Sequence, residues 1–548
     1  MFIITPQQKK SIAFGIILCL FFSIAFFLRI HDVGTFANID TSFWFTRSEK
    51  FLKNISEGEF NKVSQSGHPA VTLMWLSGSA MALANYFDGE SILNFDGDRA
   101  RLLFFAKLPL VLITSLFIVL MGFLVRKNLD PGGYLAAVLV MGFLLIDPLF
   151  LAHSRYFQMD ALVALFSVLA IMFFGFFLFV RQSNANLVWA SIFTALAVLT
   201  KSTSLVLLPF FACAFFLCRK SFDQPSRSLE FFLKKSGLAL IVLTATILLL
   251  YPALWQEPNN AIQKITHGID VGVNQEHSSN QSAPKEQHSS KMYYPMYLLT
   301  RMSIAHIVFF VIGVVYMLLQ LQKRGRVKND VIHKFLWYVL SFILFVLLLF
   351  SYTKKQDGRY ILHAILLVNV FNGLSLFAIL RTQKEKYQQW LCGTVLVMFL
   401  LQLQAVLKFH PYIASYRNAL TSIIMPSKAE RDQHRVFLVG WGEGLDQAAA
   451  FLRTYDHYKE LRVASFYDKV TGVFLPGQVK NLKNWEESDF VFIYINQVQR
   501  NVKPELLDKT VRNENITPEK VIVVNGQPYV WIYKTEDILK EKQSVDIE

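Results

Sequence analysis

Apolar runs of about 20 residues, the length an α-helix needs to cross the hydrocarbon core of a bilayer, recur along the first three quarters of this chain. Only 17% of the 548 residues are charged, against roughly 25% in an average soluble domain. The mean hydropathy is +0.37. The sequence therefore predicts a polytopic α-helical membrane protein.

We predict about eleven transmembrane helices, each centred on one apolar run. The first run follows Lys9 and Lys10 and is interpreted as a retained span, because no clear small-residue cleavage site follows it. The predicted spans are residues 11–30, 102–125, 134–152, 159–180, 186–200, 202–218, 236–254, 299–321, 332–351, 359–380 and 387–407.

The basic residues of the short loops predict the orientation, since cytoplasmic loops of membrane proteins carry an excess of Lys and Arg. With a cytoplasmic amino terminus, the inner loops hold most of the basic residues, and the short outer hairpins hold few. The carboxyl terminus is then outside. A transmembrane module, residues 1–408, is predicted to precede an outer domain, residues 409–548.

Two outer loops of the transmembrane module are long. Residues 31–101 contain the stretch "HPAVTLMWLSGSAMALANYF", which we predict to be a helix lying in the membrane interface. Residues 255–298 are polar and are predicted to be a flexible loop.

The outer domain has the pattern of a small α/β fold. The stretches "HRVFLVG", "LRVASFY", "DFVFIYI" and "YVWIYKT" are typical of buried strands, and "LDQAAAFLRTYDHYKEL" is typical of a helix.

Charge and cysteine content exclude some classes of protein. The net charge of +14 is spread over membrane-flanking loops, so it does not indicate nucleic-acid binding. The four cysteines lie in or beside apolar runs and have no metal-binding spacing.

Three outer hairpins carry cations at one predicted depth: "AHSRYFQMD" with Arg155, "LTKSTS" with Lys201, and "SYTKKQDGRYIL" with Lys354, Lys355 and Arg359. Single residues of this kind commonly snorkel toward lipid headgroups. Three hairpins together favour a bound anion, because Lys and Arg are the residues that hold phosphate.

Ionisable residues near the middle of the predicted spans are missing from the sequence, whereas ion-coupled transporters usually need them. This pattern favours chemistry on a lipid headgroup at the outer surface. Asp40, about ten residues beyond the first span, could serve there as a general base. It also precedes a predicted helix and could cap it.

These stretches resemble the membrane glycosyltransferases of GT-C fold that use polyprenyl-phosphate sugars, among them protein O-mannosyltransferases and lipid A aminoarabinose transferases. The resemblance rests on "NIDTSFWFTRSEKFL", "SGHPAVTLMWLSG", "AHSRYFQMDALVALFSVLAI", "LTKSTSLVLLPFF", "YPALWQEP", "KKQDGRYILH" and "VGWGEGLDQAAAFL", in this order.

The resemblance implies roles for individual residues. Asp40 matches the catalytic aspartate, although many relatives have Asp-Glu where this chain has Asp40-Thr41. Asp160 matches a second acidic position near the active site. The positions expected to hold the lipid phosphate are Arg155, Lys201 and Arg359, with Lys354 and Lys355 as auxiliaries. His68 matches a turn facing the same cavity, and Trp44 and Tyr360 are assigned with it to the acceptor cavity. The "GWGEG" stretch is interpreted as a strand-to-helix turn, because no Lys-Ser/Thr follows it as in a phosphate-binding loop.

The predicted reaction is an inverting transfer of a sugar from a polyprenyl-phosphate donor to an acceptor lipid, glycan or protein at the outer face of a bacterial inner membrane. A flippase for a lipid-linked glycan and a catalytically inactive assembly factor are the alternatives. No cofactor is assigned. A divalent metal is disfavoured, because His267, His277 and His288 with Glu276 and Glu286 have irregular spacing.

Overall fold

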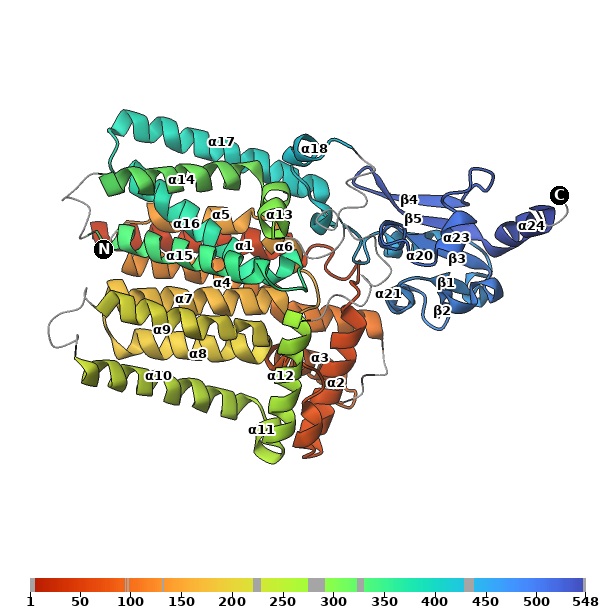
Figure 1. Ribbon diagram of the computed structural model, residues 1–548, viewed down its shortest axis with the longest axis horizontal. Coiled ribbons are helices and arrows are strands. Elements are labelled where there is room, and N and C mark those ends of the chain that lie inside the picture. Colours follow the sequence, from red (N-terminus) through yellow and green to blue (C-terminus); the bar gives the residue numbers. More distant parts are fainter. Residues whose placement is uncertain are drawn as a thin grey trace, which may run out of the picture.

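The computed structural model describes residues 5–93, 95, 98–130, 133–219, 228–274, 291–322, 330–427 and 438–545. Helices running side by side form a bundle, and a smaller α/β domain is attached at one end of it (Figure 1). The amino terminus lies at the opposite end of the bundle from this domain (Figure 1).

Eight of the described helices are long and apolar enough to cross a membrane. They are α1 (Pro6–Ile30), α4 (Arg99–Asn128), α7 (Asp160–Phe179), α10 (Leu229–Leu250), α14 (Ile304–Gln322), α15 (Val331–Ser351), the segment Gly358–Leu380 that includes α16 (Leu362–Leu380), and α17 (Glu385–Phe409). The polytopic helical fold class is confirmed.

Three shorter apolar helices coincide with the remaining predicted spans. They are α5 (Leu135–Leu145), α8 (Asn184–Thr200) and the segment Ser202–Cys218, which contains η2 (Ser202–Val206) and α9 (Leu207–Cys218). The short helix α6 (Pro148–His153) follows α5. The total of eleven spans stays a prediction, because these helices are shorter than a bilayer crossing requires.

Short helices lie across the end of the bundle that faces the outer domain. α2 (Thr41–Ser56) and α12 (Pro258–Asn274) run across the ends of the long helices (Figure 1). α3 (Val71–Phe87), the helix predicted from "HPAVTLMWLSGSAMALANYF", packs between α2 and α4. Its position in a membrane interface stays a prediction.

The flexible loop predicted for residues 255–298 is wrong over its described part. α11 (Ala253–Gln256) and α12 cover its beginning, and α13 (Tyr293–Arg301) covers its end. α12 is fixed because Gly268 lies against the backbone of Gly67, where a Cβ would collide. Lys264 also donates a 2.6 Å hydrogen bond to the carbonyl of Ser64.

The outer domain contains a five-stranded sheet of order β2-β1-β3-β5-β4. β1 (Val463–Ser465) pairs in parallel with β2 (Val479–Asn481) and β3 (Phe490–Tyr494), whereas β5 (Gln527–Lys534) is antiparallel to β3 and β4 (Lys520–Val524). The remaining outer helices are α18 (Leu420–Ile424), α20 (Leu445–Leu452), α21 (Asp468–Phe474), α22 (Ile495–Gln499), α23 (Pro504–Asp508) and α24 (Thr535–Val545).

The α/β character predicted for this domain is confirmed. Three of the four predicted strands correspond to β1, β3 and β5. Most of "HRVFLVG" lies outside the described residues, and its end, residues 438–440, is not a strand. The predicted helix is shorter than expected, because α20 ends at Leu452.

Candidate active site

Asp40 lies at the start of α2, in the loop that follows α1. It occupies the N-cap position of α2, but its carboxylate makes no capping hydrogen bond, so the capping interpretation is wrong. Oδ2 of Asp40 instead accepts a 2.8 Å hydrogen bond from Nη1 of Arg359. The Asp40 side chain remains 27% exposed, which leaves the carboxylate open to a substrate.

Arg359 is the centre of the charged site. It lies in the short helix η7 (Gly358–Ile361), whose N-cap is Asp357. Its Nε lies 3.2 Å from Oδ2 of Asp357, and its Nη1 lies 3.7 Å from Oδ2 of Asp160. A planar guanidinium can serve three carboxylates in this way because its donors point in fixed, different directions.

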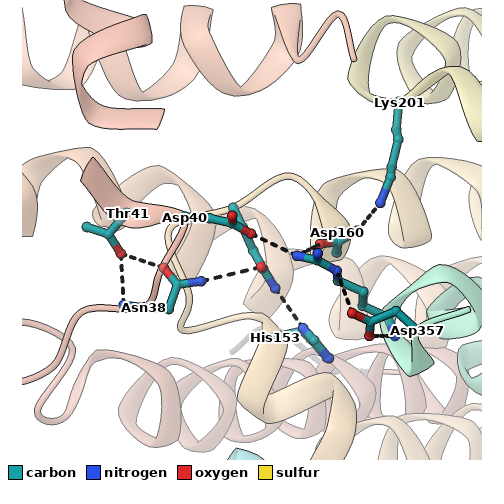
Figure 2. Close-up of polar contacts among 9 residues, drawn as sticks. Asn38, Asp40, Thr41, His153, Asp160, Lys201 and Asp357 are labelled. Atoms are coloured by element: carbon teal, nitrogen blue, oxygen red, sulfur yellow. Dashed lines mark hydrogen bonds and ion pairs between the residues drawn. The ribbon is translucent and has the colours of Figure 1, made fainter. Parts of the chain in front are cut away.

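Asp160 and Lys201 form a second, more deeply buried ion pair. Asp160 is the first residue of α7, and Lys201 ends α8. Nζ of Lys201 lies 2.6 Å from Oδ1 of Asp160, and the two side chains are 4% and 3% exposed. Lys201 approaches Asp160 from the side away from Asp40 (Figure 2). The three hairpins that carry Asp160, Lys201 and Arg359 thus meet the loop of Asp40 at one place.

Three other predicted residues border this cluster. Nζ of Lys201 lies 4.4 Å from the ring centroid of Tyr360. Burial and the charges of Arg359 and Lys201 lower the pKa of Lys355. Burial, followed by the charge of Lys201, lowers the pKa of His68 to about 3, so His68 is neutral at physiological pH. We name the group Asp40, Asp160, Lys201, Asp357 and Arg359 the charged cluster.

Three of the residues predicted for the site make their contacts outside the charged cluster. Arg155 donates a 2.6 Å hydrogen bond to the carbonyl of His31. Burial lowers the pKa of Arg155 to about 10, which leaves it charged at pH 7. The side chain of Lys354 is exposed, and its backbone N–H donates to the carbonyl of Val273. Trp44 is buried and packs under the guanidinium of Arg47 at 4.7 Å. The structure does not bring these three into the charged cluster.

A chain of neutral polar side chains connects the Asp40 loop with α6. The amide of Asn38 lies 3.4 Å from Oε1 of Gln158, and Nε2 of Gln158 lies 2.7 Å from Nδ1 of His153. Thr41 hydrogen bonds to Asn38 at the other end of this chain (Figure 2). Sequence reasoning named none of these as site residues, although His153 and Gln158 lie in the same hairpin as Asp160.

One group of possible metal ligands is present in the part of the chain that the structure describes. His31, Asp32 and His410 place ligand atoms within 4.8 Å of one another. The positive charge of Arg155 acts on this group and, after burial, helps to lower the pKa of His410 to about 4. A neighbouring cation opposes a bound metal ion, so we assign none. Of the histidines and glutamates considered from the sequence, His277, His288, Glu276 and Glu286 lie outside the described residues.

The structure combines helices long and apolar enough to cross a membrane, a charged cluster at one end of the bundle and an attached α/β domain. The structure is similar to ArnT from Cupriavidus metallidurans bound to undecaprenyl phosphate. The two are 13% identical, the match covers 94% of this chain and 97% of that chain, and the TM-score is 0.50. The predicted GT-C fold is confirmed.

The chain also matches one protein-family model over part of its length, and its structure is similar to two further solved structures. Residues 63–256 match the model of the family dolichyl-phosphate-mannose-protein mannosyltransferase, and this segment includes Asp160 and Lys201 but not Asp40 or Arg359. ArnT in the apo state matches at 13% identity over 96% of this chain and 99% of that chain, with a TM-score of 0.48. AglB from Archaeoglobus fulgidus, an archaeal oligosaccharyltransferase in complex with an inhibitory peptide and a dolichol-phosphate, matches at 13% identity over 91% and 72%, also with a TM-score of 0.48. No curated protein matches the chain. The family match supports glycosyl transfer as the general class of activity.

Proposed function

We propose that the protein transfers a sugar from a polyprenyl-phosphate donor to an acceptor at the outer face of the membrane. The observation that carries the proposal is the meeting of Asp40 with Arg359, Asp160 and Lys201 at one end of the bundle. A carboxylate beside two fixed cations is what an acceptor hydroxyl and a leaving phosphate need together.

Lys201 and Arg359 form the phosphate side of the proposed site. When the donor's glycosidic bond breaks, the electron pair stays on a phosphate oxygen, and fixed cations stabilise the charge that develops there. Arg359 and Lys201 are already paired with carboxylates, so a phosphate competes for them. The family match to mannosyltransferases and the undecaprenyl phosphate in the structurally similar ArnT support a prenol-linked donor.

Asp40 is the proposed general base. Donor phosphate that draws Arg359 toward itself would release Oδ2 of Asp40 to accept the acceptor's proton. The acceptor oxygen or nitrogen then bonds to the anomeric carbon while the bond from that carbon to the phosphate oxygen breaks. A single displacement inverts the configuration at that carbon. Phosphate is a good leaving group, so no protein acid has to protonate it.

The position of the site in the molecule agrees with the orientation proposed from the loop charges. α2, which begins directly after Asp40, and the outer domain lie at the end of the bundle opposite to the amino terminus (Figure 1). A cytoplasmic amino terminus, proposed from the basic inner loops, places the site outside. A bacterial inner membrane is the proposed location.

A transfer assay with Asp40→Asn tests the proposal. Membranes containing the protein and its natural acceptors are given undecaprenyl-phosphate-linked mannose or aminoarabinose, labelled in the sugar. We expect transfer of the label from at least one donor and a loss of about 100-fold or more in Asp40→Asn. Asp98→Asn, which changes an N-cap carboxylate to another good capping group, should keep full activity.

Two outcomes would contradict the proposal. Labelled lipid that crosses the membrane with its glycosidic bond intact indicates a flippase. Failure of both donors to react or to bind, in a protein that is folded, indicates an inactive assembly factor.

A further inference from the structure

The "GWGEG" stretch of the outer domain forms a turn that reaches the charged cluster. We propose that the turn, Gly440–Gly444, belongs to the substrate site. It holds the pair of Arg359 and Asp40 in place and, together with α6, forms a cavity that binds the hydroxyl groups of a sugar. This inference rests on the glycosyl transfer proposed above and extends the site to the outer domain.

Trp441 contacts both sides of the ion pair. Its ring lies under the guanidinium of Arg359, with 4.7 Å between the guanidinium carbon and the ring centroid. Its carbonyl accepts a 3.0 Å hydrogen bond from the backbone N–H of Ile39, the residue before Asp40. One residue of the outer domain therefore positions Arg359 through its ring and the Asp40 loop through its backbone.

Glu443 fixes the turn to the membrane module. Its carboxylate accepts a 2.6 Å hydrogen bond from the hydroxyl of Tyr156, in the loop before α7, and another of 2.6 Å from the N–H of Trp441. Glu443 is 3% exposed, so these bonds form away from water, where they are strong. The turn is thus a fixed wall of the site.

The turn needs its three glycines for their backbone conformation, and one of them permits close contact with the Asp40 loop. Gly440, Gly442 and Gly444 have φ values of +91°, +130° and +84°, which residues with a Cβ rarely adopt. A Cβ on Gly442 would also collide with the carbonyl oxygen of Ala37, in the loop that leads to Asp40. Gly442 therefore serves the approach of two backbones, which a simple strand-to-helix turn would not require.

A cavity lies between this turn, α6 and α13. Its lining includes His153, Asp357, Trp441 and Glu443, together with Arg301 and Arg500. The charges of the two carboxylates and the two guanidinium groups cancel, so the lining favours neither an anionic nor a cationic ligand. Polar groups of both kinds beside an aromatic ring suit an uncharged ligand rich in hydroxyl groups, such as a sugar ring.

His153 gives this cavity a hydrogen-bond donor. Burial is the main cause that lowers the pKa of His153 to about 4, so the ring is neutral. The side-chain oxygen of Gln158 accepts a hydrogen bond from the amide of Asn38, so the amide nitrogen of Gln158 is the group that faces Nδ1 of His153. Because that nitrogen is a donor, Nδ1 accepts the hydrogen bond. The proton of the neutral ring is then on Nε2, from which it can be donated to a sugar oxygen.

The test compares Trp441→Phe, Trp441→Leu and His153→Leu in the labelled-donor assay, with kcat and KM measured separately for donor and acceptor. Trp441→Leu should lower kcat/KM about 10-fold to 100-fold, and Trp441→Phe should restore most of it, because a phenyl ring also attracts a guanidinium. His153→Leu should raise KM about 10-fold by removing one donor to the sugar. Trp531→Leu, in strand β5, controls for damage to the outer domain and should lower the melting temperature without moving KM.

The substrate whose KM rises in His153→Leu shows which sugar the cavity binds. A rise for the donor assigns the cavity to the transferred sugar, and a rise for the acceptor assigns it to an acceptor glycan. Wild-type kcat and KM in Trp441→Leu and His153→Leu would overturn the inference, as would equal losses in Trp441→Leu and Trp441→Phe. An inactive wild-type protein would instead contradict the proposed function.

Discussion

Nη1 of Arg359 lies 2.8 Å from Oδ2 of Asp40, although 319 positions separate the two residues in the chain. The loop that follows α1 and the hairpin between α15 and α16 meet in this ion pair. The charged cluster therefore forms only when the helices between them are assembled.

Arg359→Lys should lower kcat/KM about 100-fold while the protein stays folded. Lysine keeps the positive charge but lacks the planar set of donors by which Arg359 serves Asp40 and Asp357 together. Steady-state kinetics with the labelled donor, alongside a thermal unfolding curve, would measure both effects. Arg462→Lys, at a half-exposed arginine of the outer domain, is the matched control. Full activity in Arg359→Lys would show that only charge matters at this position.

The buried pair of Asp160 and Lys201 should show strong coupling in a double-mutant cycle. Removing one partner leaves the other charged and buried, which costs about 3–5 kcal/mol. Asp160→Asn and Lys201→Met should each destabilise the protein by this order, and the double variant should cost less than the sum of the two. Unfolding free energies in detergent would give the coupling. Additive effects would mean that water or lipid already screens the pair.

Part of this site was predictable from the sequence, and the reason is topological. Lys201 and Arg359 occupy hairpins on the predicted outer side, and the structure brings both to Asp160. Arg155 lies in a hairpin of the same kind, yet its side chain contacts the carbonyl of His31. Loop charges indicate the depth of a residue, whereas the direction of its side chain depends on turn geometry that no periodicity encodes.

The long helices could be predicted from the sequence, whereas the helix α12 was missed. A long apolar run indicates a span by its length alone. The segment that forms α12 is polar overall, but Ile262, Ile265 and Ile269 are spaced three and four residues apart, a helical pattern that the prediction of a loop overlooked. The role proposed for Trp441 was hidden, because its partners are at positions 39 and 359.

Acidification should destabilise the protein through His153. The pKa of His153 is about 4 in the folded protein, below the value of about 6.5 expected in the unfolded chain. The unfolded state then binds more protons between these values, so stability is full above pH 6.5 and falls as the pH decreases toward 4. At pH 5.5 the loss from this residue is roughly 1.4 kcal/mol.

The measurement compares unfolding at pH 7.5 and 5.5 in the wild-type protein and in His153→Gln. The variant cannot take up this proton, so its loss of stability on acidification should be smaller. His457→Gln, at an exposed histidine of the outer domain, should behave as the wild type does. Equal losses in the wild-type protein and His153→Gln would show that other groups, such as His68, dominate the acid response.

Gly442→Ala should reduce glycosyl transfer more than it reduces stability. A Cβ at this position collides with the carbonyl of Ala37 and is strained by the φ value of +130°. The loop before Asp40 must then shift away from Trp441, which separates Asp40 from Arg359. Displacements of about 1 Å can cost 100-fold in rate, so we expect kcat to fall by about that factor. Gly472→Ala, where a Cβ would meet nothing within 4 Å, is the matched control in the same domain and should leave kcat unchanged. If Gly442→Ala lowers the melting temperature but keeps the wild-type kcat, the contact between the turn and the Asp40 loop is structural and has no part in positioning the base.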